Sequence, residues 1–372
     1  MEASGSRNRA PQNDELEISL FGPGVGECVI VHLGHNEWMV VDSCKDAARS
    51  QPVALQYLDE LGVDVESDVK LIVVTHWHDD HIDGVSQLVK AAKNARVAIS
   101  AALQSQEFAE FVQLYSKATF VERTSGISEF ESLLREFKSR RGNAATRLGG
   151  PDIWALEGLP LRPQTTGVAA VTALSPSSQS MTDALARFTK LLPKSGDRPR
   201  RLPRFTPNDS SIVLRIDTPE FSAILGGDLE NVADPKRGWN AVIASPHRGS
   251  LKSNAVKIAH HGSDNGDHHE MWSEMLIPSP FALLTPFSCG RKPLPAETDV
   301  QRMKARTDDL YCTAWPSTRR PPKRMSVVRR TIQDIALSHR AMPPNAGHIR
   351  LRTPLNGPFE PSIELFDGAV RL

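Results

Sequence analysis

Residues 75 to 84 read THWHDDHIDG, and this short stretch holds three of the twelve histidines of the chain together with three aspartates. It follows VKLIVV, a run of β-branched and apolar residues that is typical of a buried central strand. It precedes VSQLVKAAK, whose apolar residues have the periodicity of a helix. The sequence therefore predicts a polar loop between a buried strand and a helix.

The spacing of the polar residues in this loop is typical of a metal site. Side chains two positions apart in an extended stretch lie on the same face, so His76 and His78 can converge on one ion. The turn that follows directs Asp80 and His81 toward a second position. Imidazole and carboxylate ligands suit zinc, manganese or iron, and a site without cysteine is typical of catalytic rather than structural metal.

Segments on both sides of the loop favour two β-sheets flanked by helices. Upstream, LEISLFG, CVIVHLG and EWMVVDS read as short strands separated by glycine and asparagine turns, and residues 46–61 have helical periodicity. Downstream, strands are predicted at SSIVLRID, FSAILGGD, NAVKIAHHGS and PFALLTPFS, and GHIRLRT with PSIELFDGAVRL is expected to form a closing hairpin. Strands in both halves end in ligand-type residues, so we expect the two sheets to face one another.

The remaining segments set the predicted domain limits. Residues 128–141, SEFESLLREFKSRR, predict an amphipathic helix with Ser128 and Glu131 as a capping box. Residues 176–207 are rich in proline, serine and arginine and are expected to be a mobile insertion. The overall prediction is a disordered N-terminus at residues 1–14 and a single domain at residues 15–372. The domain is expected to have two insertions, near residues 100–205 and 296–345.

Composition excludes several classes of protein. Forty-four basic and forty-four acidic residues cancel, so the global charge indicates neither a nucleic-acid-binding nor a membrane-binding protein. The N-terminus lacks the apolar region of a signal peptide and no stretch is apolar enough to span a membrane, which predicts a cytoplasmic protein. No CxxC spacing occurs, which favours reduced thiols. The cysteines are Cys28, Cys44, Cys289 and Cys312.

THWHDDHIDG resembles the HxHxDH signature of the metallo-β-lactamase superfamily, and three other stretches resemble motifs of that family. EWMVVDS is similar to the strand that carries an aspartate behind the site, here Asp42. FSAILGGDLE is similar to the GD motif, which implies that Asp228 bridges two metals. VKIAHHGS is similar to the late histidine motif and implies His261 as a ligand, with His260 as the alternative. The resemblance implies an α/β fold, an αββα four-layer sandwich of two mixed sheets.

Within this superfamily the chain most resembles the hydrolase domain of ComEC-type competence proteins, here as a soluble, stand-alone hydrolase. The resemblance lies in GPGVGECVIV, NDSSIVLRID, GGDLE and VKIAHHGS. No histidine occurs between His81 and His247, so the third histidine that the family often supplies to the first ion is missing, and Asp228 and water would complete that site. After PFALLTPFS, where the family often has an asparagine and a His-Pro pair, this chain has Arg291 and Lys292.

The resemblance implies a metal-dependent hydrolase with one or two zinc ions, or manganese as the alternative. A divalent ion lowers the pKa of bound water from about 15.7 to about 7, which makes a nucleophile available at neutral pH. Asp80 is expected to bind metal and to orient the attacking water, with Lys257 or Ser263 assisting at the substrate. Hydrogen bonds that the metal-bound imidazoles donate to carboxylates are expected to hold the rings in place. The residues predicted for this role are Asp42, Asp79 and Asp83.

The favoured substrate is a phosphodiester, in nucleic acid or in nucleotides. The basic stretches 187–204 and 319–330 could form a groove for a phosphate backbone, or they could be solvated loops. One alternative keeps the metal and changes the bond to a lactone, thioester or amide. Another is a non-catalytic scaffold component of a multi-protein system, and a protein partner is compatible with each hypothesis.

Overall fold

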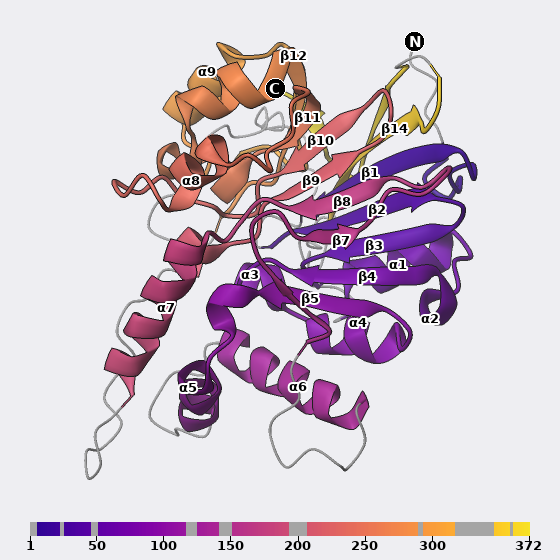
Figure 1. Ribbon diagram of the computed structural model, residues 1–372. Coiled ribbons are helices and arrows are strands. Elements are labelled where there is room, and N and C mark those ends of the chain that lie inside the picture. Colours follow the sequence, from indigo (N-terminus) through magenta and orange to yellow (C-terminus); the bar gives the residue numbers. More distant parts are fainter. Residues whose placement is uncertain are drawn as a thin grey trace, which may run out of the picture.

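Two β-sheets face one another in the fold, and helices lie on both outer surfaces (Figure 1). The computed structural model describes residues 6–22, 26–45, 51–116, 125–140, 151–192, 207–288, 293–316, 346–357 and 360–372. One apolar cluster fills the space between the sheets. Each sheet also has one further cluster, which lies between that sheet and the helices that cover it. The predicted αββα four-layer sandwich is therefore confirmed.

Within the described residues each sheet has eight strands, and each mixes parallel and antiparallel pairs. The first sheet runs, from edge to edge, β15 (Ser362–Phe366), β14 (Gly347–Pro354), β1 (Glu15–Gly22), β2 (Cys28–Gly34), β3 (Glu37–Val41), β4 (Val69–Val74), β5 (Arg96–Ser100) and β6 (Ile153–Ala155). The second runs β16 (Val370–Arg371), β13 (Leu310–Cys312), β12 (Leu276–Leu284), β11 (Ser253–Lys257), β10 (Ser222–Leu225), β9 (Leu214–Asp217), β8 (Ala170–Ala173) and β7 (Pro160–Arg162).

Helices cover the two outer faces. The α-helices are α1 (Val53–Glu60), α2 (Val65–Asp68), α3 (Asp79–Ile82), α4 (Val85–Ala91), α5 (Gln106–Ser116), α6 (Ser125–Arg140), α7 (Ser178–Leu191), α8 (Gly238–Ala244) and α9 (Glu297–Lys304). Short helical turns are η1 (Ala101–Leu103), η2 (Pro207–Ser210), η3 (Ala259–Gly262), η4 (Asp264–Gly266) and η5 (Met271–Met275). The cluster outside the first sheet includes residues of α1, α4, α5, α6 and α7, and the cluster outside the second includes residues of α8 and α9. None of the described helices has both the length and the apolar character that a membrane crossing requires.

The central strand β4 explains how the sequence produces these layers. Its side chains alternate, so that Ile72 and Val74 pack against helices while Leu71 and Val73 pack between the sheets. Lys70 is the exposed position near the beginning of the strand. A strand that is covered on both faces needs apolar residues at nearly every position, which is why VKLIVV shows no polar alternation.

The strands that carry the predicted site residues all present them at one edge of the sandwich. β4 leads into His76, β10 leads into Asp228 and β11 leads into His261. β2 begins directly after Glu27. The buried strands therefore bring together residues that are far apart in the sequence.

Residues 6–14 correct the prediction of a disordered N-terminus. The buried guanidinium of Arg350 on β14 donates to the backbone carbonyls of Ser6 and Arg7, at 3.1 and 2.8 Å. Arg352, also buried, donates to the carbonyl of Arg9. Buried guanidinium donors require acceptors, and this segment supplies them. Its order therefore depends on the C-terminal strand β14.

Part of the stretch 100–205, predicted as an insertion, belongs to the sheets instead. β6 is the edge strand of the first sheet, and β7 and β8 complete one side of the second. α7 lies where a mobile loop was expected, and the Ser177 side chain caps it by accepting a hydrogen bond from the Ser180 backbone N–H at 3.2 Å. A helix with a serine cap can thus begin inside a serine-rich stretch.

The C-terminal strands form the predicted hairpin only in part. β14 and β15 pair antiparallel in the first sheet. β16 instead pairs antiparallel with β13 in the second sheet. The last residues of the chain therefore link the two sheets.

Candidate metal centre

The loop after β4 and the loop after β10 form a first group of ligand atoms. His76 Nε2 lies 3.2 Å from His78 Nδ1 and 3.9 Å from Asp228 Oδ2. His76 and Asp228 are buried, and His78 is partly buried. The three side chains could hold one metal ion, as the spacing of the histidines predicts.

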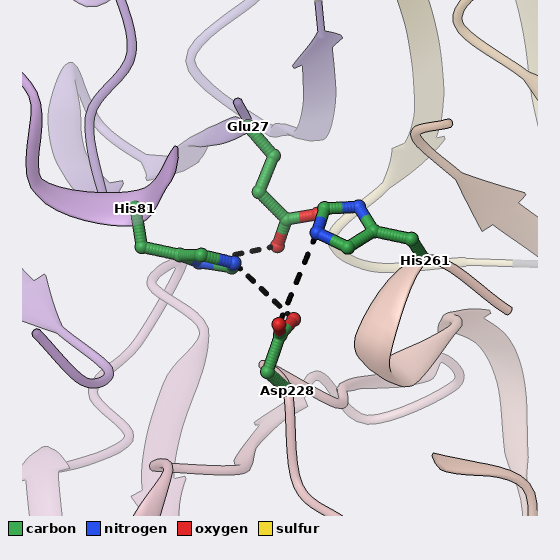
Figure 2. Close-up of side chains that lie close together, drawn as sticks. All are labelled: Glu27, His81, Asp228 and His261. Carbon is green, nitrogen blue, oxygen red and sulfur yellow. Dashed lines mark ion pairs between the residues drawn. The ribbon is translucent and has the colours of Figure 1, made fainter. Parts of the chain in front are cut away.

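A second group of ligand atoms lies beside the first and shares Asp228 with it (Figure 2). His81 Nε2 lies 3.2 Å from Asp228 Oδ1, and His261 Nε2 lies 3.9 Å from Asp228 Oδ2. Asp80 Oδ2 lies 3.0 Å from His261 Nε2 and 3.7 Å from His81 Nε2. The structure thus brings all of these predicted ligands together around a second position.

Unpaired polar atoms show that these residues fit a divalent cation. His81 Nε2 and Asp228 Oδ1 are buried, and neither has a hydrogen-bond partner of acceptable geometry. Leaving a buried polar atom unpaired costs about 1–3 kcal/mol. Two such atoms facing one another, surrounded by imidazole and carboxylate donors, form a ligand set that suits zinc or manganese.

Asp42 fixes which nitrogen of two histidines is free to bind metal. Its Oδ2 accepts a hydrogen bond from His81 Nδ1 at 2.7 Å and another from the Thr75 hydroxyl at 2.6 Å. Thr75 Oγ1 in turn accepts from His76 Nδ1 at 3.0 Å. Because a carboxylate can only accept, Nδ1 of His81 carries a proton, and Nε2 is the nitrogen that can bind a metal after losing its own proton. Asp42 lies where a carboxylate holding an imidazole was predicted.

The turn after β11 directs its two histidines to different sides. His260 and His261 have φ values of 49° and 53°, a left-handed backbone that is rare outside glycine. His261 Nδ1 donates to the Thr285 carbonyl at 3.2 Å, which leaves Nε2 for metal. His260 Nε2 instead lies 3.3 Å from Asn208 Nδ2, and His260 Nδ1 lies 3.4 Å from Glu230. Of the two alternatives, His261 is the one that joins the second group.

Glu27 is a residue of this centre that the sequence analysis did not name. Its Oε1 pairs with the Lys257 ammonium, and its Oε2 accepts a hydrogen bond from Thr285 Oγ1 at 2.7 Å. Its Oε1 also lies 3.6 Å from His81 Nδ1, the nitrogen that faces away from the metal position. Although Glu27 is close enough to count among the second group, these contacts favour a role in supporting the histidines. The available signal was a single acidic residue between a glycine-rich turn and an apolar strand.

The two residues predicted to assist at the substrate make other contacts. Lys257 is 2% exposed, pairs with Glu27 and donates to the Gly227 carbonyl at 2.9 Å. Ser263 donates to the Asn265 side chain. Lys257 balances buried carboxylates in this structure, and its role as a helper at the phosphodiester stays a prediction.

Asp79 and Asp83 were predicted to hold imidazoles, and the structure places them elsewhere. Asp79 Oδ1 accepts a hydrogen bond from the backbone N–H of Gly126 at 2.6 Å, which joins the start of α6 to the metal loop. α6 therefore begins upstream of the capping box predicted at Ser128. Asp83 pairs with Lys45 at 2.7 Å. Only Asp42 of the three predicted carboxylates contacts a histidine ring in this way.

Several basic residues expected to contact a polyanion lie outside the described residues. They are Arg291, Lys292, the part of 187–204 after Leu192, and all of 319–330. Within the described part, Arg187 on α7 pairs with Asp209, so a carboxylate already balances its charge. The phosphate-backbone groove stays a prediction.

The histidines of the two groups differ in proton affinity. Burial, together with neighbouring His81, lowers the pKa of His76 well below its ordinary value, and burial also lowers the pKa of His78. Burial opposes a charge on His81 too, but Asp228 and Asp80 outweigh it and raise the pKa of His81 well above its ordinary value. At neutral pH the metal-free protein therefore has neutral imidazoles in the first group and an imidazolium in the second.

We expect metal binding at the second position to release about one proton or more per ion at pH 7, since the ion must displace the proton of His81. Binding at the first position should release almost none. The affinity of the second position should therefore fall as the pH falls, while the metal-free protein gains stability from protonated His81 at low pH and loses it as the pH rises through the raised pKa.

Calorimetric titration of zinc into the metal-free protein, in buffers of different ionisation enthalpy, measures this release. A His78→Ala variant isolates the second position. The assignment would be contradicted if zinc binding released no proton either in the wild type or in the His78→Ala variant.

A family model described as the metallo-beta-lactamase superfamily matches residues 21–260. Solved structures that are similar include the metallo-beta-lactamase SMB-1 bound to 2-mercaptoethanesulfonate, at 17% identity and a TM-score of 0.34, covering 69% of this chain and 82% of that chain. They also include the metallo-beta-lactamase fold protein YhfI from Bacillus subtilis, at 12% identity and a TM-score of 0.32, covering 65% of this chain and 70% of that chain. Among curated proteins no match was found.

Proposed function

The chain belongs to the metallo-beta-lactamase superfamily, whose members are metal-dependent hydrolases, and we propose that it hydrolyses phosphodiester bonds in nucleic acid or in nucleotides. The observation that carries the metal-dependent part is that His81, Asp228 and His261 are buried and bring ligand atoms within 4.8 Å of one another. Zinc fits the donors, and manganese is the alternative. A bound divalent ion would supply Lewis acidity and activate a water molecule at neutral pH.

The residues of the chain have separate roles in this proposal. Asp42 holds His81, and through Thr75 it also holds His76, so that their free nitrogens keep one orientation. Asp228 is 2% exposed and lies between the two groups of ligands. Asp80 is more accessible, at 14% exposure of its side chain, so it is the carboxylate that can face the attacking water.

The pKa of Asp80 suits a residue that orients water. Burial raises this pKa, but His81 and His261 outweigh burial and hold it below the ordinary value. The carboxylate is therefore ionised at neutral pH and accepts a hydrogen bond. Because it is a weak base, its contribution lies in positioning the water molecule for attack.

Two arguments support a phosphodiester as the substrate. The motifs GPGVGECVIV, NDSSIVLRID and VKIAHHGS resemble those of competence-type hydrolases that act in DNA uptake. In addition, two groups of ligands that share one carboxylate are typical of sites that bind both the attacking and the leaving oxygen of a phosphoryl group.

The proposal predicts that an Asp80→Ala, His81→Ala double variant loses phosphodiesterase activity. The expected loss is roughly 10²- to 10⁴-fold, since both the water-orienting carboxylate and a ligand of the second position are removed. Bound zinc and manganese, and the hydrolysis of single-stranded DNA and bis(p-nitrophenyl) phosphate, are measured together. An Asp59→Ala, His35→Asn variant, which changes exposed residues of the same types, serves as the control.

Hydrolysis of a lactone, thioester or amide is a second candidate, which one feature favours. An apolar cavity of 250 Å³ lies between α5, α6 and the ends of β5 and β6, with Phe108 and Phe130 in its lining. Phe108 packs against Trp77, which lies between His76 and His78, with ring centroids 6.1 Å apart. Cleavage of acyl esters without cleavage of either phosphodiester would favour this candidate. A wild type that binds no metal would instead favour the hypothesis of a non-catalytic scaffold.

A further inference from the structure

The first metal position has fewer ligands than a zinc ion normally takes. Among the described residues, histidine, cysteine and carboxylate side chains supply three ligands there, from His76, His78 and Asp228. Protein zinc sites are usually four-coordinate. No histidine occurs between His81 and His247, so the sequence offers no further imidazole from the middle of the chain.

Asn208, at the start of the loop that precedes β9, has an unpaired amide oxygen. Its Nδ2 donates to Glu230 Oε1 at 2.8 Å, and because a carboxylate can only accept, this contact fixes which end of the amide is the oxygen. Asn208 is 2% exposed, and its Oδ1 is buried with no hydrogen-bond partner. Asn208 Oδ1 is therefore a buried polar atom without a hydrogen bond, as are His81 Nε2 and Asp228 Oδ1 in the metal centre.

Contacts through Ser211 and His260 link Asn208 to the loops that carry the metal ligands. Its backbone carbonyl accepts from Ser211 N–H at 3.1 Å, and Ser211 Oγ lies 3.5 Å from His76 Nδ1 and accepts from Asp228 N–H at 3.0 Å. On its other side, Asn208 Nδ2 lies 3.3 Å from His260 Nε2.

Gly227 lies where the loop before β9 approaches the loop after β10 closely. Its φ is +51°, and a Cβ there would lie 2.6 Å from Ser211 Oγ and 2.7 Å from the Ile212 carbonyl. The glycine before Asp228 therefore lets the loop that carries Asn208 approach the loop that carries Asp228. Both loops meet at the ligands of the first position.

We propose that Asn208 Oδ1 is the fourth protein ligand of the ion at the first position. The proposal rests on the proposed metal-dependent function and assigns a residue that completes its centre. Glu230 and His260 hold the amide from the side of its nitrogen and so direct its oxygen. A neutral oxygen ligand binds zinc less strongly than an imidazole does, so the first position should bind zinc more weakly than the second and accept manganese more readily.

Metal content decides the proposal independently of activity. Wild type, Asn208→Ala and Asn208→His are dialysed against zinc or manganese over a range of concentrations, and bound metal is measured by mass spectrometry. Asn208→Ala should lose affinity for one ion by roughly 10- to 100-fold while it keeps the other. Asn208→His should tighten zinc and weaken manganese at the same position. Asn240→Ala is the matched control, because both ends of the Asn240 amide have partners away from the ligand groups.

The absorption spectrum of the cobalt-substituted protein gives a second readout in case Asn208→Ala fails to fold. Asn208→His should change the cobalt spectrum by replacing an oxygen ligand with nitrogen, and an unchanged spectrum would overturn the proposal. Two ions bound with wild-type affinities by Asn208→Ala would overturn it as well, and would leave the proposed function intact. Two ions in a wild type that cleaves no phosphodiester would instead overturn the proposed substrate, and the ligand assignment would stand on the metal affinities.

Discussion

Asp228→Ala should remove both metal ions and lower hydrolysis by about 10³-fold or more. Asp228 is the one side chain found in both groups of ligand atoms, with Oδ1 3.2 Å from His81 Nε2 and Oδ2 3.9 Å from His76 Nε2. Loss of this carboxylate removes a ligand from each position at once. Metal content and the rate on bis(p-nitrophenyl) phosphate should therefore fall together.

Asp228→Asn separates charge from shape in this experiment. It keeps an oxygen donor but removes the negative charge, so we expect intermediate metal affinity. Asp217→Asn is the control, because Asp217 lies on the neighbouring strand β9 and pairs with Arg215 away from the ligands. Retention of both ions and of the wild-type rate by Asp228→Ala would refute the proposed centre.

Lys257→Met should lower the free energy of unfolding of the metal-free protein by about 3–5 kcal/mol. Lys257 and Glu27 form a buried ion pair, with side-chain exposures of 2% and 3%. Burial lowers the pKa of Lys257, but Glu27 and Asp228 outweigh burial and raise it, so the ammonium stays charged through neutral pH. Without it, the carboxylate of Glu27 loses its paired cation while it stays buried near Asp228.

Urea unfolding of wild type, Lys257→Met, Glu27→Gln and the double variant, with and without zinc, tests this interpretation. The double variant should recover much of the lost stability, since it removes both charges of the pair. Zinc should also recover part of it by adding positive charge to the centre. A Lys257→Met protein within about 1 kcal/mol of wild type would show that the pair does not balance the centre.

The local pattern of the sequence predicted the HxHxDH ligands, and the resemblance to the superfamily implied Asp228 and His261. HxHxDH comes directly after β4, and Asp228 comes shortly after β10, so each ligand lies at the end of a strand that must be buried. Once the two sheets face one another, these ends meet at one edge. The strand patterns predicted two facing sheets flanked by helices, and VKLIVV is covered on both faces as its apolar run indicates.

Glu27 and Lys257 could not be paired from the sequence. Each is a charged residue beside or within an apolar strand, and the two are 230 positions apart. Neither position has a local explanation, because each charge is stabilised only by the other after the sheets have packed. Asn208 lies in the motif NDSSIVLRID, but the orientation of its amide depends on a hydrogen bond to Glu230. The local sequence pattern does not reveal that contact.

The prediction of disorder at residues 6–14 was wrong for a similar reason, because contacts with distant residues hold this segment. Residues 6–14 are polar, and without partners such a segment would have no reason to be ordered. Their backbone carbonyls accept hydrogen bonds from Arg350 and Arg352, which lie on a strand near the other end of the chain. A polar composition alone could not distinguish a free segment from one held by buried arginines.

Because β1 pairs along its length with β14, the first sheet cannot be completed until β14 has been synthesised. Glu17 and Arg352, which face one another in this pair, are 335 positions apart. At typical rates of synthesis, β14 follows β1 by on the order of 20–70 s. During that time one edge of β1 lacks its native partner, and such an edge can pair with other chains. The β1 edge is therefore open to incorrect pairing until β14 emerges.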